Sequence, residues 1–445
     1  MCELEGDGVA FFSLPDKALP VIGRMLAETV MHDVIAACDP AARVRQALGD
    51  PEVAARLAGR RRFAFAAGKA ALAMARGAGE VVEGIAVVPE GAGGELPRGW
   101  RLLEAAHPVP DQRSVAAGLA LQALVRTPAP SDVILALISG GASALAEVPI
   151  SALDELVATI RGVMAAGAAI DEINTVRGAL SAIKAGQLAR EAPAPIVTLA
   201  VSDVIGDTLA VIGSGPTIGP WLASPGIAVV DDAAGRRSRA RAILERHGVA
   251  VPPVLAAEPP ARRGTSPATR SVVRTDHAAV IAPMASAAHA AVGALASRGV
   301  AATLLEAPIA GDVEAVARML AVLAAQGDAM SFVAWGEPTL RLPADHGTGG
   351  RAQQLALVLA RWLRGTARGA LVVGTDGIDG PPPAGRPAPA GAWVDGTTWD
   401  AIAATGRDPA AALARCDAGS ALDAAGALIV TGPSGINHAD LVILG

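Results

Sequence analysis

Five short apolar segments in this 445-residue chain each run directly into a glycine-containing loop. Helix-like patterns lie between several of them. Strands that alternate with helices predict an α/β fold with mainly parallel strands. In such sheets ligands bind beyond the carboxyl ends of the strands, where these loops are expected to lie. The five segments are residues 62–66, 132–138, 196–201, 370–373 and 427–430.

Residues 251–270 are rich in proline and arginine and show little periodicity. Such a composition predicts a linker, which divides the chain into an N-terminal domain at 17–250 and a C-terminal domain at 271–445. A second Pro/Gly segment, 380–391, is expected to be a loop inside the C-terminal domain. Residues 1–16 are expected to be an extension.

The composition argues against several classes of function. Lys+Arg total 37 against 43 for Asp+Glu, so the net charge of −6 provides no electrostatic footprint for nucleic acid. Aromatic residues make up 2% of the chain, which disfavours base-stacking surfaces. Three cysteines form neither a disulfide framework nor a metal knuckle. No stretch has the roughly 20 strongly apolar residues of a membrane span. We therefore expect a cytoplasmic protein without a nucleic-acid or membrane partner.

Lysine and asparagine are rare in this chain, which is rich in Ala, Gly, Pro and Arg. Lysine occurs only at positions 17, 69 and 184, and asparagine only at 174 and 437. Four of these five lie in or beside glycine-rich motifs. They are therefore the first candidates for functional residues, although chance placement among 50 glycines is the alternative.

Residues 171–190 are predicted to form one helix with Asp171 as its N-cap. Asn174, Arg177, Ser181 and Lys184 are spaced 3, 4 and 3 apart, so they would form a polar stripe beside the buried face. An amide, a guanidinium, a hydroxyl and an ammonium group in one line suit an anionic ligand. The alternative is a polar face exposed to solvent.

Four glycine-containing loops have the form of anion sites, because backbone amides at a helix start favour negative charge. Lys69 and Arg351 would add full charges to two of these loops. For each loop the alternative is an ordinary turn, and for His107 a turn role is likewise favoured over substrate positioning. The candidate ligand-binding residues are Gly68, Ser139, Gly140, Gly141, Ser143, Ser214, Gly215, Thr217, Gly349 and Gly350, together with Asn174, Arg177, Lys184 and Asn437.

Four aspartates follow two of the expected strands. Phosphoryl transfer needs carboxylates for Mg²⁺ and one group to accept a hydroxyl proton. Asp203 is the candidate catalytic carboxylate, Asp376 and Asp379 are candidate metal ligands, and Asp207 is a candidate binding residue. Their assignment among these roles stays open, and the alternative for each is a turn aspartate that caps its own backbone.

Taken together, the motifs resemble those of the MOFRL-type glycerate 2-kinase family (DUF4147 plus MOFRL domains). The resemblance extends in order from about residue 20 to the end of the chain. The matching segments are AAGKAALAMA, HPVPD, LISGGASAL, EINTVRGALSAIKAGQLA, VSDVIGDTLAVIGSGPT, GTGGRAQQLAL, GTDGIDG and TGPSGIN.

This resemblance implies an N-terminal Rossmann-like three-layer αβα domain, a smaller C-terminal α/β domain and an active site in the cleft between them. It implies phosphorylation of D-glycerate to 2-phosphoglycerate with ATP and Mg²⁺, with Lys69 and Arg351 as catalytic cations. We also expect small-molecule substrates, glycerate or a similar hydroxy acid and ATP, and the sequence is compatible with a homodimer.

The chain departs from the family pattern near the expected cleft. Ala352 and Gln354 replace an asparagine and a glutamate, Ala185 replaces a glycine, and prolines follow Gly380. Three alternatives therefore stay open. They are a kinase for a related sugar acid, a catalytically weakened ligand-binding relative, and an NAD(P)H-dependent hydroxypyruvate reductase. The last lacks a proper dinucleotide-binding fingerprint.

Overall fold

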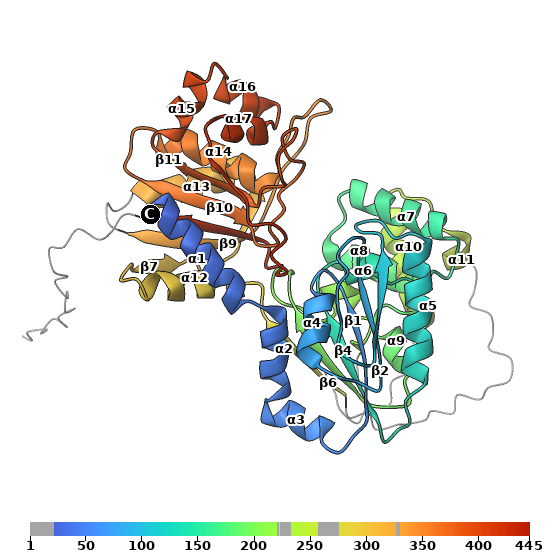
Figure 1. Ribbon diagram of the computed structural model, residues 1–445. Coiled ribbons are helices and arrows are strands. Elements are labelled where there is room, and N and C mark those ends of the chain that lie inside the picture. The colour runs from blue at the N-terminus through green and yellow to red at the C-terminus, as the bar shows by residue number, and fades with distance from the viewer. Residues whose placement is uncertain (1–21, 220–221, 223–232, 257–275, 326–329) are drawn as a thin grey trace, which may run out of the picture.

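The computed structural model describes residues 22–219, 222, 233–256, 276–325 and 330–445, which form two β-sheets with helices on both faces (Figure 1). The mixed α/β, two-domain architecture agrees with the prediction. The predicted extension at 1–16 and residues 257–270 of the predicted linker lie outside the described residues. Within these residues no helix combines the length and apolarity that a bilayer crossing requires.

The first sheet consists of six parallel strands in the order β3-β2-β1-β4-β5-β6. The order reverses between β1 and β4, and ligand sites in open α/β sheets form at such a reversal. The strands are β1 (Arg62–Ala67), β2 (Glu83–Pro89), β3 (Trp100–Ala105), β4 (Val133–Ile138), β5 (Ile196–Val201) and β6 (His277–Ala282).

Both faces of the first sheet are buried, which makes a three-layer αβα structure. Phe63, Phe65 and Ala67 of β1 pack into one apolar cluster, whereas Ala64 and Ala66 pack into another, as the alternation of a strand requires. The helices of this part of the chain are α2 (Pro40–Leu48), α3 (Pro51–Leu57), α4 (Ala71–Ala78), α5 (Gln112–Arg126), α6 (Ala142–Leu145), α7 (Leu153–Ala165), α8 (Ile170–Leu180), α9 (Gln187–Arg190), α10 (Ala233–Arg246) and α11 (Pro253–Ala256).

The second sheet is mixed rather than mainly parallel. Its central strands pair antiparallel in the order β12-β11-β10-β13-β9, and β7 and β8 pair parallel with β9. The strands are β7 (Ala302–Leu304), β8 (Ile309–Asp312), β9 (Ser331–Thr339), β10 (Gly369–Gly374), β11 (Gly391–Asp395), β12 (Leu428–Ile429) and β13 (Asp440–Leu444).

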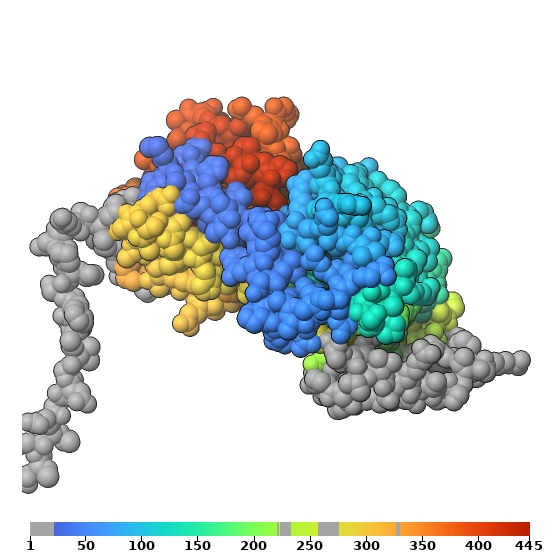
Figure 2. All heavy atoms as spheres, turned by 60° about the horizontal axis from the view of Figure 1, so that its bottom comes forward, coloured from blue at the N-terminus to red at the C-terminus, as the bar shows by residue number. Residues whose placement is uncertain are grey.

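Helices cover both faces of the second sheet. One face packs against α13 (Val313–Ala325), α14 (Arg351–Leu363), α15 (Thr398–Ala404), α16 (Pro409–Ala414) and α17 (Ala418–Ala424). The other packs against α12 (Ser286–Ala296) and the N-terminal helix α1 (Arg24–Ala37). Figure 2 shows the N-terminal helices, in blue, extending from one domain to the other.

Two elements lie on the opposite side of the predicted domain boundary. Strand β6 pairs with β5 and completes the first sheet, although its residues fall within 271–445. Helix α1 packs against α12 under the second sheet, although its residues fall within 17–250. Helix α1 buries an apolar face and β6 is partly buried, and the sequence pattern does not assign either element to a sheet. The division of the chain at residues 251–270 stays a prediction.

The single helix predicted for residues 171–190 is wrong. Helix α8 ends at Leu180, Ser181 is extended and pairs with Pro149, and Ala185 and Gly186 have positive φ angles of 52° and 76°. The side-chain amide of Gln187 then donates to the carbonyls of Gly178, Ser181 and Lys184. The N-cap is Ala169, so Asp171 lies inside the first turn. A side-chain capping interaction therefore replaces the helical hydrogen bonds that were expected.

Candidate functional site

The loops after β1 and β4 meet at the point where the strand order reverses. The Lys69 amide donates to the Gly140 carbonyl at 2.8 Å, and the Ala70 amide donates to Ser139 Oγ at 3.1 Å. Gly68 has a φ of 128°, and a Cβ there would overlap Ser139. Only glycine therefore allows residue 68 to lie this close to Ser139. Ser139 is fully buried, so it supports the loop instead of facing a ligand.

Lys69 extends from this loop to the other domain. Its Nζ lies 3.1 Å from Oδ2 of Asp376, which follows β10 of the second sheet. The Lys69 side chain is 35% exposed and that of Asp376 is 28% exposed, so the pair remains accessible to a ligand. The structure thus brings together a predicted catalytic cation and a predicted metal ligand.

A second contact joins the two domains beside the first. Asn437 Nδ2 donates to Asp203 Oδ2 at 3.1 Å, and the Asp203 carboxylate lies against Gly140, where a Cβ would overlap it. Burial raises the pKa of Asp203, and this effect outweighs the nearby Lys69 charge and the Asn437 hydrogen bond. Asp203 is therefore a stronger proton acceptor than a solvated aspartate.

His107, for which a turn role was predicted, lies beside the Gly140-Gly141 loop. Its ring lies next to Gly141, where a Cβ would be 3.1 Å from His107 Nε2 and 3.5 Å from Lys69 Cγ. Burial and, to a smaller extent, the Lys69 charge lower the pKa of His107, so the neutral imidazole is favoured. A sequence signal existed, because His107 lies in HPVPD, one of the segments that carry the family resemblance.

Arg351 is held by two carboxylates at the start of α14. Its Nε lies 2.7 Å from Asp440 Oδ2, its Nη2 lies 3.1 Å from Asp440 Oδ1, and its Nη1 lies 2.9 Å from Glu337 Oε1. Burial raises the pKa of Asp440 to about 7, and the Arg351 charge opposes this shift only in part. Neither Asp440 nor Glu337 was predicted to have a role, although Glu337 is a lone carboxylate in an otherwise uncharged strand.

A cavity of about 530 Å³ opens in front of Arg351. The lining comes from the end of β9 and the following segment, from the loop before α14 and from the loop after β10, with one residue from the first domain. These residues are Ile205, Glu337, Pro338, Thr339, Leu340, Leu342, Gly349, Gly350, Arg351, Gly380 and Pro381. Gly349 and Gly350 were predicted binding residues, and Arg351 was a predicted catalytic cation.

Asp379, a predicted metal ligand, has different partners. Its carboxylate accepts hydrogen bonds from the amides of Ala352 and Gln353 at 3.0 and 2.7 Å, and it lies against Gly350. A carboxylate of the chain itself therefore caps the start of α14, where an external anion was expected. In the described part of the chain, no three His, Cys, Asp or Glu side chains are grouped closely enough to enclose a metal ion.

Lys184 points into the protein, away from the cleft. Its Nζ lies 2.9 Å from Glu147 Oε2, and both side chains are only 2% exposed. It also donates to the carbonyls of Ser143 and Ala146 at 2.9 and 3.1 Å. All three ammonium protons thus have acceptors inside the domain. The geometry gives Lys184 a structural role under α6, which differs from the predicted contact with a ligand.

Three other predicted residues form a chain of side-chain hydrogen bonds next to Lys184. Ser143 Oγ lies 2.8 Å from Ser214 Oγ, which donates to Asn174 Oδ1 at 3.0 Å. Asn174 Nδ2 is buried and has no partner among the described residues. Arg177 lies one turn along the same helix and is partly buried, and burial lowers its pKa.

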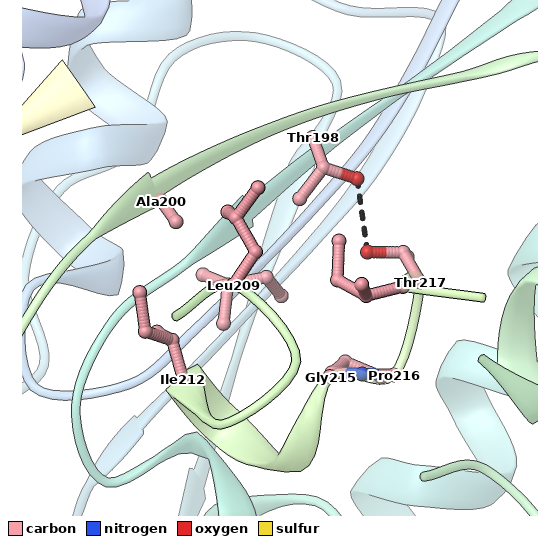
Figure 3. A pocket seen from close by; sticks show the side chains of 9 residues that line it. Thr198, Ala200, Leu209, Ile212, Gly215, Pro216 and Thr217 are labelled. Atoms are coloured by element: carbon pink, nitrogen blue, oxygen red, sulfur yellow. Dashed lines mark hydrogen bonds between the residues drawn. The ribbon is translucent and has the colours of Figure 1, made fainter. Parts of the chain in front are cut away.

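The remaining predicted loop residues have partners within the protein. Thr217 is buried, and its hydroxyl bonds to that of Thr198 at 2.9 Å beside a hollow too small for a water molecule (Figure 3). The Gly215 carbonyl accepts a hydrogen bond from the Gly186 amide. Asp207 accepts from the Met284 amide at 2.8 Å, which joins it to the turn after β6. These contacts support the loops around the site.

The fold and the site together define a two-domain α/β protein with a polar cleft. A parallel sheet of Rossmann order supplies Lys69, Asp203 and His107, and a second, mixed sheet supplies Asp376 and Asn437. The charged side chains meet beyond the carboxyl ends of β1, β4 and β5, as the rule for open α/β sheets requires.

Comparison with known proteins identifies the family. Residues 26–257 match the model described as a domain of unknown function (DUF4147), and residues 330–440 match the MOFRL family. The chain therefore belongs to the family whose members combine a DUF4147 domain with a MOFRL domain. The resemblance that its motifs indicated is confirmed.

Relatives and a solved structure match most of the chain. D-glycerate 2-kinase of Thermotoga maritima is 32% identical over 85% of this chain and 89% of its own length. A protein of Agrobacterium vitis, named provisionally as a hydroxypyruvate reductase, is 35% identical over 84% of this chain and 96% of its own. The crystal structure of glycerate kinase from Thermotoga maritima superposes with a TM-score of 0.77 at 28% identity, covering 94% and 98% of the two chains.

Proposed function

We propose that this protein is a glycerate 2-kinase, which transfers the γ-phosphoryl group of ATP to the 2-hydroxyl of D-glycerate. The observation that carries the proposal is the pair of contacts across the cleft, Lys69 with Asp376 and Asn437 with Asp203. They join a cation, a carboxylate of raised pKa and a second carboxylate beside the glycine pair Gly140-Gly141. Phosphoryl transfer requires these groups.

In the proposed mechanism, Lys69 stabilises the negative charge on the transferring phosphoryl group. Asp203 accepts the hydroxyl proton, because burial makes its carboxylate more basic and Asn437 holds one of its oxygens in place. The neutral His107 ring lies beside Gly141 and can orient the glycerate hydroxyl groups. Contact between the two domains excludes water from the transfer.

Mg²⁺ fits this arrangement as an ion that binds together with ATP. Protein cages for Mg²⁺ are uncommon, and the ion is usually held by one or two carboxylates together with the phosphates of the substrate. Asp376 would hold it, because its carboxylate is partly exposed at the cleft. Bound there, Mg²⁺ would neutralise phosphate charge. Asp379 is less suited, because its oxygens cap α14.

A coupled assay tests the proposal directly. The protein is incubated with ATP, Mg²⁺ and D-glycerate, and ADP formation is followed together with conversion of the product by enolase, which accepts 2-phosphoglycerate but not 3-phosphoglycerate. We expect ADP and an enolase-competent product in equal amounts. Product that enolase does not consume would place the phosphate elsewhere, and no glycerate-dependent ADP formation would contradict the proposal.

Lys69→Met tests the role of the cation. Loss of the Lys69 charge should lower kcat by about 10²- to 10³-fold, as for other groups that stabilise transition-state charge. Arg361→Met is the matched control, because Arg361 is a partly exposed cation on α14 that pairs with Glu314 outside the cleft. The control should keep wild-type kcat. A Lys69→Met protein with wild-type turnover would refute the assigned role.

Two rival functions, reduction of hydroxypyruvate and ligand binding without catalysis, are tested with the same protein preparation. Reduction of hydroxypyruvate is favoured by the strand order of the first sheet and by the provisional names of two Agrobacterium vitis relatives. The loop after β1 reads Ala-Gly-Lys-Ala-Ala-Leu and lacks the three glycines of a dinucleotide fingerprint. Oxidation of NADH in the presence of hydroxypyruvate would support that reading. A rise in melting temperature with ATP or glycerate but no turnover would support a ligand-binding relative.

A further inference from the structure

The cavity in front of Arg351 has more room than the proposed mechanism uses. Its volume of about 530 Å³ lies in the range of small-molecule sites, and the proposed mechanism assigns no role to the residues that line it. Gly349, Gly350 and Arg351 lie at one end of the cavity. The rest extends along the end of β9 and the segment that follows it. No ligand group has been assigned to this part of the cavity.

The wall of that remaining part is apolar and comes from both domains. Ile205 of the first domain is 47% exposed, and Leu342 of the second is 55% exposed. Leu340, Pro338 and Pro381 extend the same wall. Large aliphatic side chains that stay exposed at one cavity favour an apolar ligand group.

The end of the cavity next to Arg351 is polar. Glu337 uses Oε1 to bind Arg351 Nη1 at 2.9 Å, while its side chain is 51% exposed. Its other oxygen, Oε2, accepts no hydrogen bond from any described residue. A carboxylate oxygen that faces a cavity can accept hydrogen bonds from a pair of sugar hydroxyls, as acidic residues do in dinucleotide sites. The Arg351 guanidinium at this end supplies positive charge toward which a phosphate chain can extend.

We propose that this cavity holds the adenosine part of ATP. The base lies between Ile205 and Leu342, the ribose hydroxyls donate to Glu337, and the phosphates extend past Arg351 toward Lys69. The inference rests on the proposed kinase function and adds the position of the nucleotide to it. The base then contacts aliphatic side chains, in agreement with the scarcity of aromatic residues in the chain.

The ribose contact is tested with Glu337→Ala and two nucleotides, ATP and 2′,3′-dideoxy-ATP. Their dissociation constants are measured by calorimetry, so the result does not depend on turnover. The wild-type protein should bind ATP about tenfold or more tightly than the dideoxy analogue, as expected for a hydrogen bond to a charged group. The variant should bind both nucleotides alike. If Glu337 serves only to orient Arg351, the variant weakens both equally and the preference persists, which would overturn the proposal.

The base contact is tested with Leu342→Asp. A charge placed in the apolar wall should raise the KM for ATP about tenfold or more and leave the KM for glycerate unchanged. Val322→Asp is the matched control, because Val322 is similarly exposed at 53% but lies on α13, outside the cavity lining. A wild-type KM for ATP in Leu342→Asp would overturn the assignment of the base.

The two proposals fail in distinguishable ways. If the wild-type protein phosphorylates glycerate while both variants keep wild-type affinity for ATP, the nucleotide lies elsewhere and only this inference falls. If ATP binds with the expected sensitivity to both substitutions but no glycerate is phosphorylated, the cavity assignment stands and the kinase assignment falls. If the wild-type protein does not bind ATP, both fall.

Discussion

Replacing Lys184 with methionine should destabilise the N-terminal domain and should slow phosphoryl transfer less than Lys69→Met does. The Lys184 ammonium group is buried against Glu147 and two backbone carbonyls, and it does not reach the cleft. Methionine has a similar length, so the substitution removes the charge and leaves the packing nearly unchanged. It leaves the Glu147 carboxylate, which is 2% exposed, without its cation.

The size of the effect follows from that unpaired carboxylate. Breaking a buried ion pair by removal of one partner costs about 3–5 kcal/mol. For a domain of roughly 200 residues, each kcal/mol lowers the melting temperature by about 2–4 °C, so a drop of about 6–20 °C is expected. Glu147 keeps one hydrogen bond, from the Val148 amide at 2.9 Å, which does not replace a charge.

The assay is thermal unfolding of four proteins: the wild type, Lys184→Met, Glu147→Gln and the double variant. Removal of the carboxylate together with the ammonium group should restore most of the lost stability, since a neutral pair leaves no buried charge. Turnover is measured well below each melting temperature. A Lys184→Met protein with wild-type thermal stability but turnover as low as that of Lys69→Met would refute this reasoning and return Lys184 to the phosphoryl-transfer site.

Two further predictions concern a buried histidine and a helix cap. Burial lowers the pKa of His438 from 6.5 to about 4. Between these two pH values His438 is protonated in the unfolded chain but not in the folded one, so wild-type stability falls as the pH falls from about 6.5 to about 4. His438→Leu should lose this part of the pH dependence in urea unfolding, and parallel curves for the two proteins would contradict it. Asp379→Ala should lower the free energy of unfolding by about 0.5–2 kcal/mol, because α14 loses its cap. It should not raise the Mg²⁺ concentration that gives half-maximal activity, and a marked rise would instead identify Asp379 as a metal ligand.

The parts of the fold that depend on local pattern could be predicted well. Strand β5 has the predicted bounds, and β1 and β4 differ from prediction by one residue each. These strands are buried on both faces, so they appear in the sequence as continuous apolar runs that end at glycine. The antiparallel centre of the second sheet could not be read in this way, because an apolar run does not reveal the direction of its neighbour.

The candidate site was predicted in part for a related reason. Lys69, Asp203, Asp376 and Asn437 were identified because rare or acidic residues follow predicted strands, and the structure brings them together. Lys184 was identified by the same rarity, yet its charge is satisfied by Glu147 inside the domain. Glu337 carried too weak a signal, since a single carboxylate in a strand is ordinary until a cavity is seen beside it.

Apolar periodicity and glycine placement are local properties, so they were enough to predict the class of fold and the loops in which the polar residues lie, and the order of the motifs indicated the family. Which of those residues share a site depends instead on contacts between distant parts of the chain. Lys69 and Asp376 are 307 positions apart and meet at 3.1 Å, whereas Lys184 turns inward. Side-chain partners depend on how two sheets approach each other, and that approach is set by packing between distant segments, which no local pattern records.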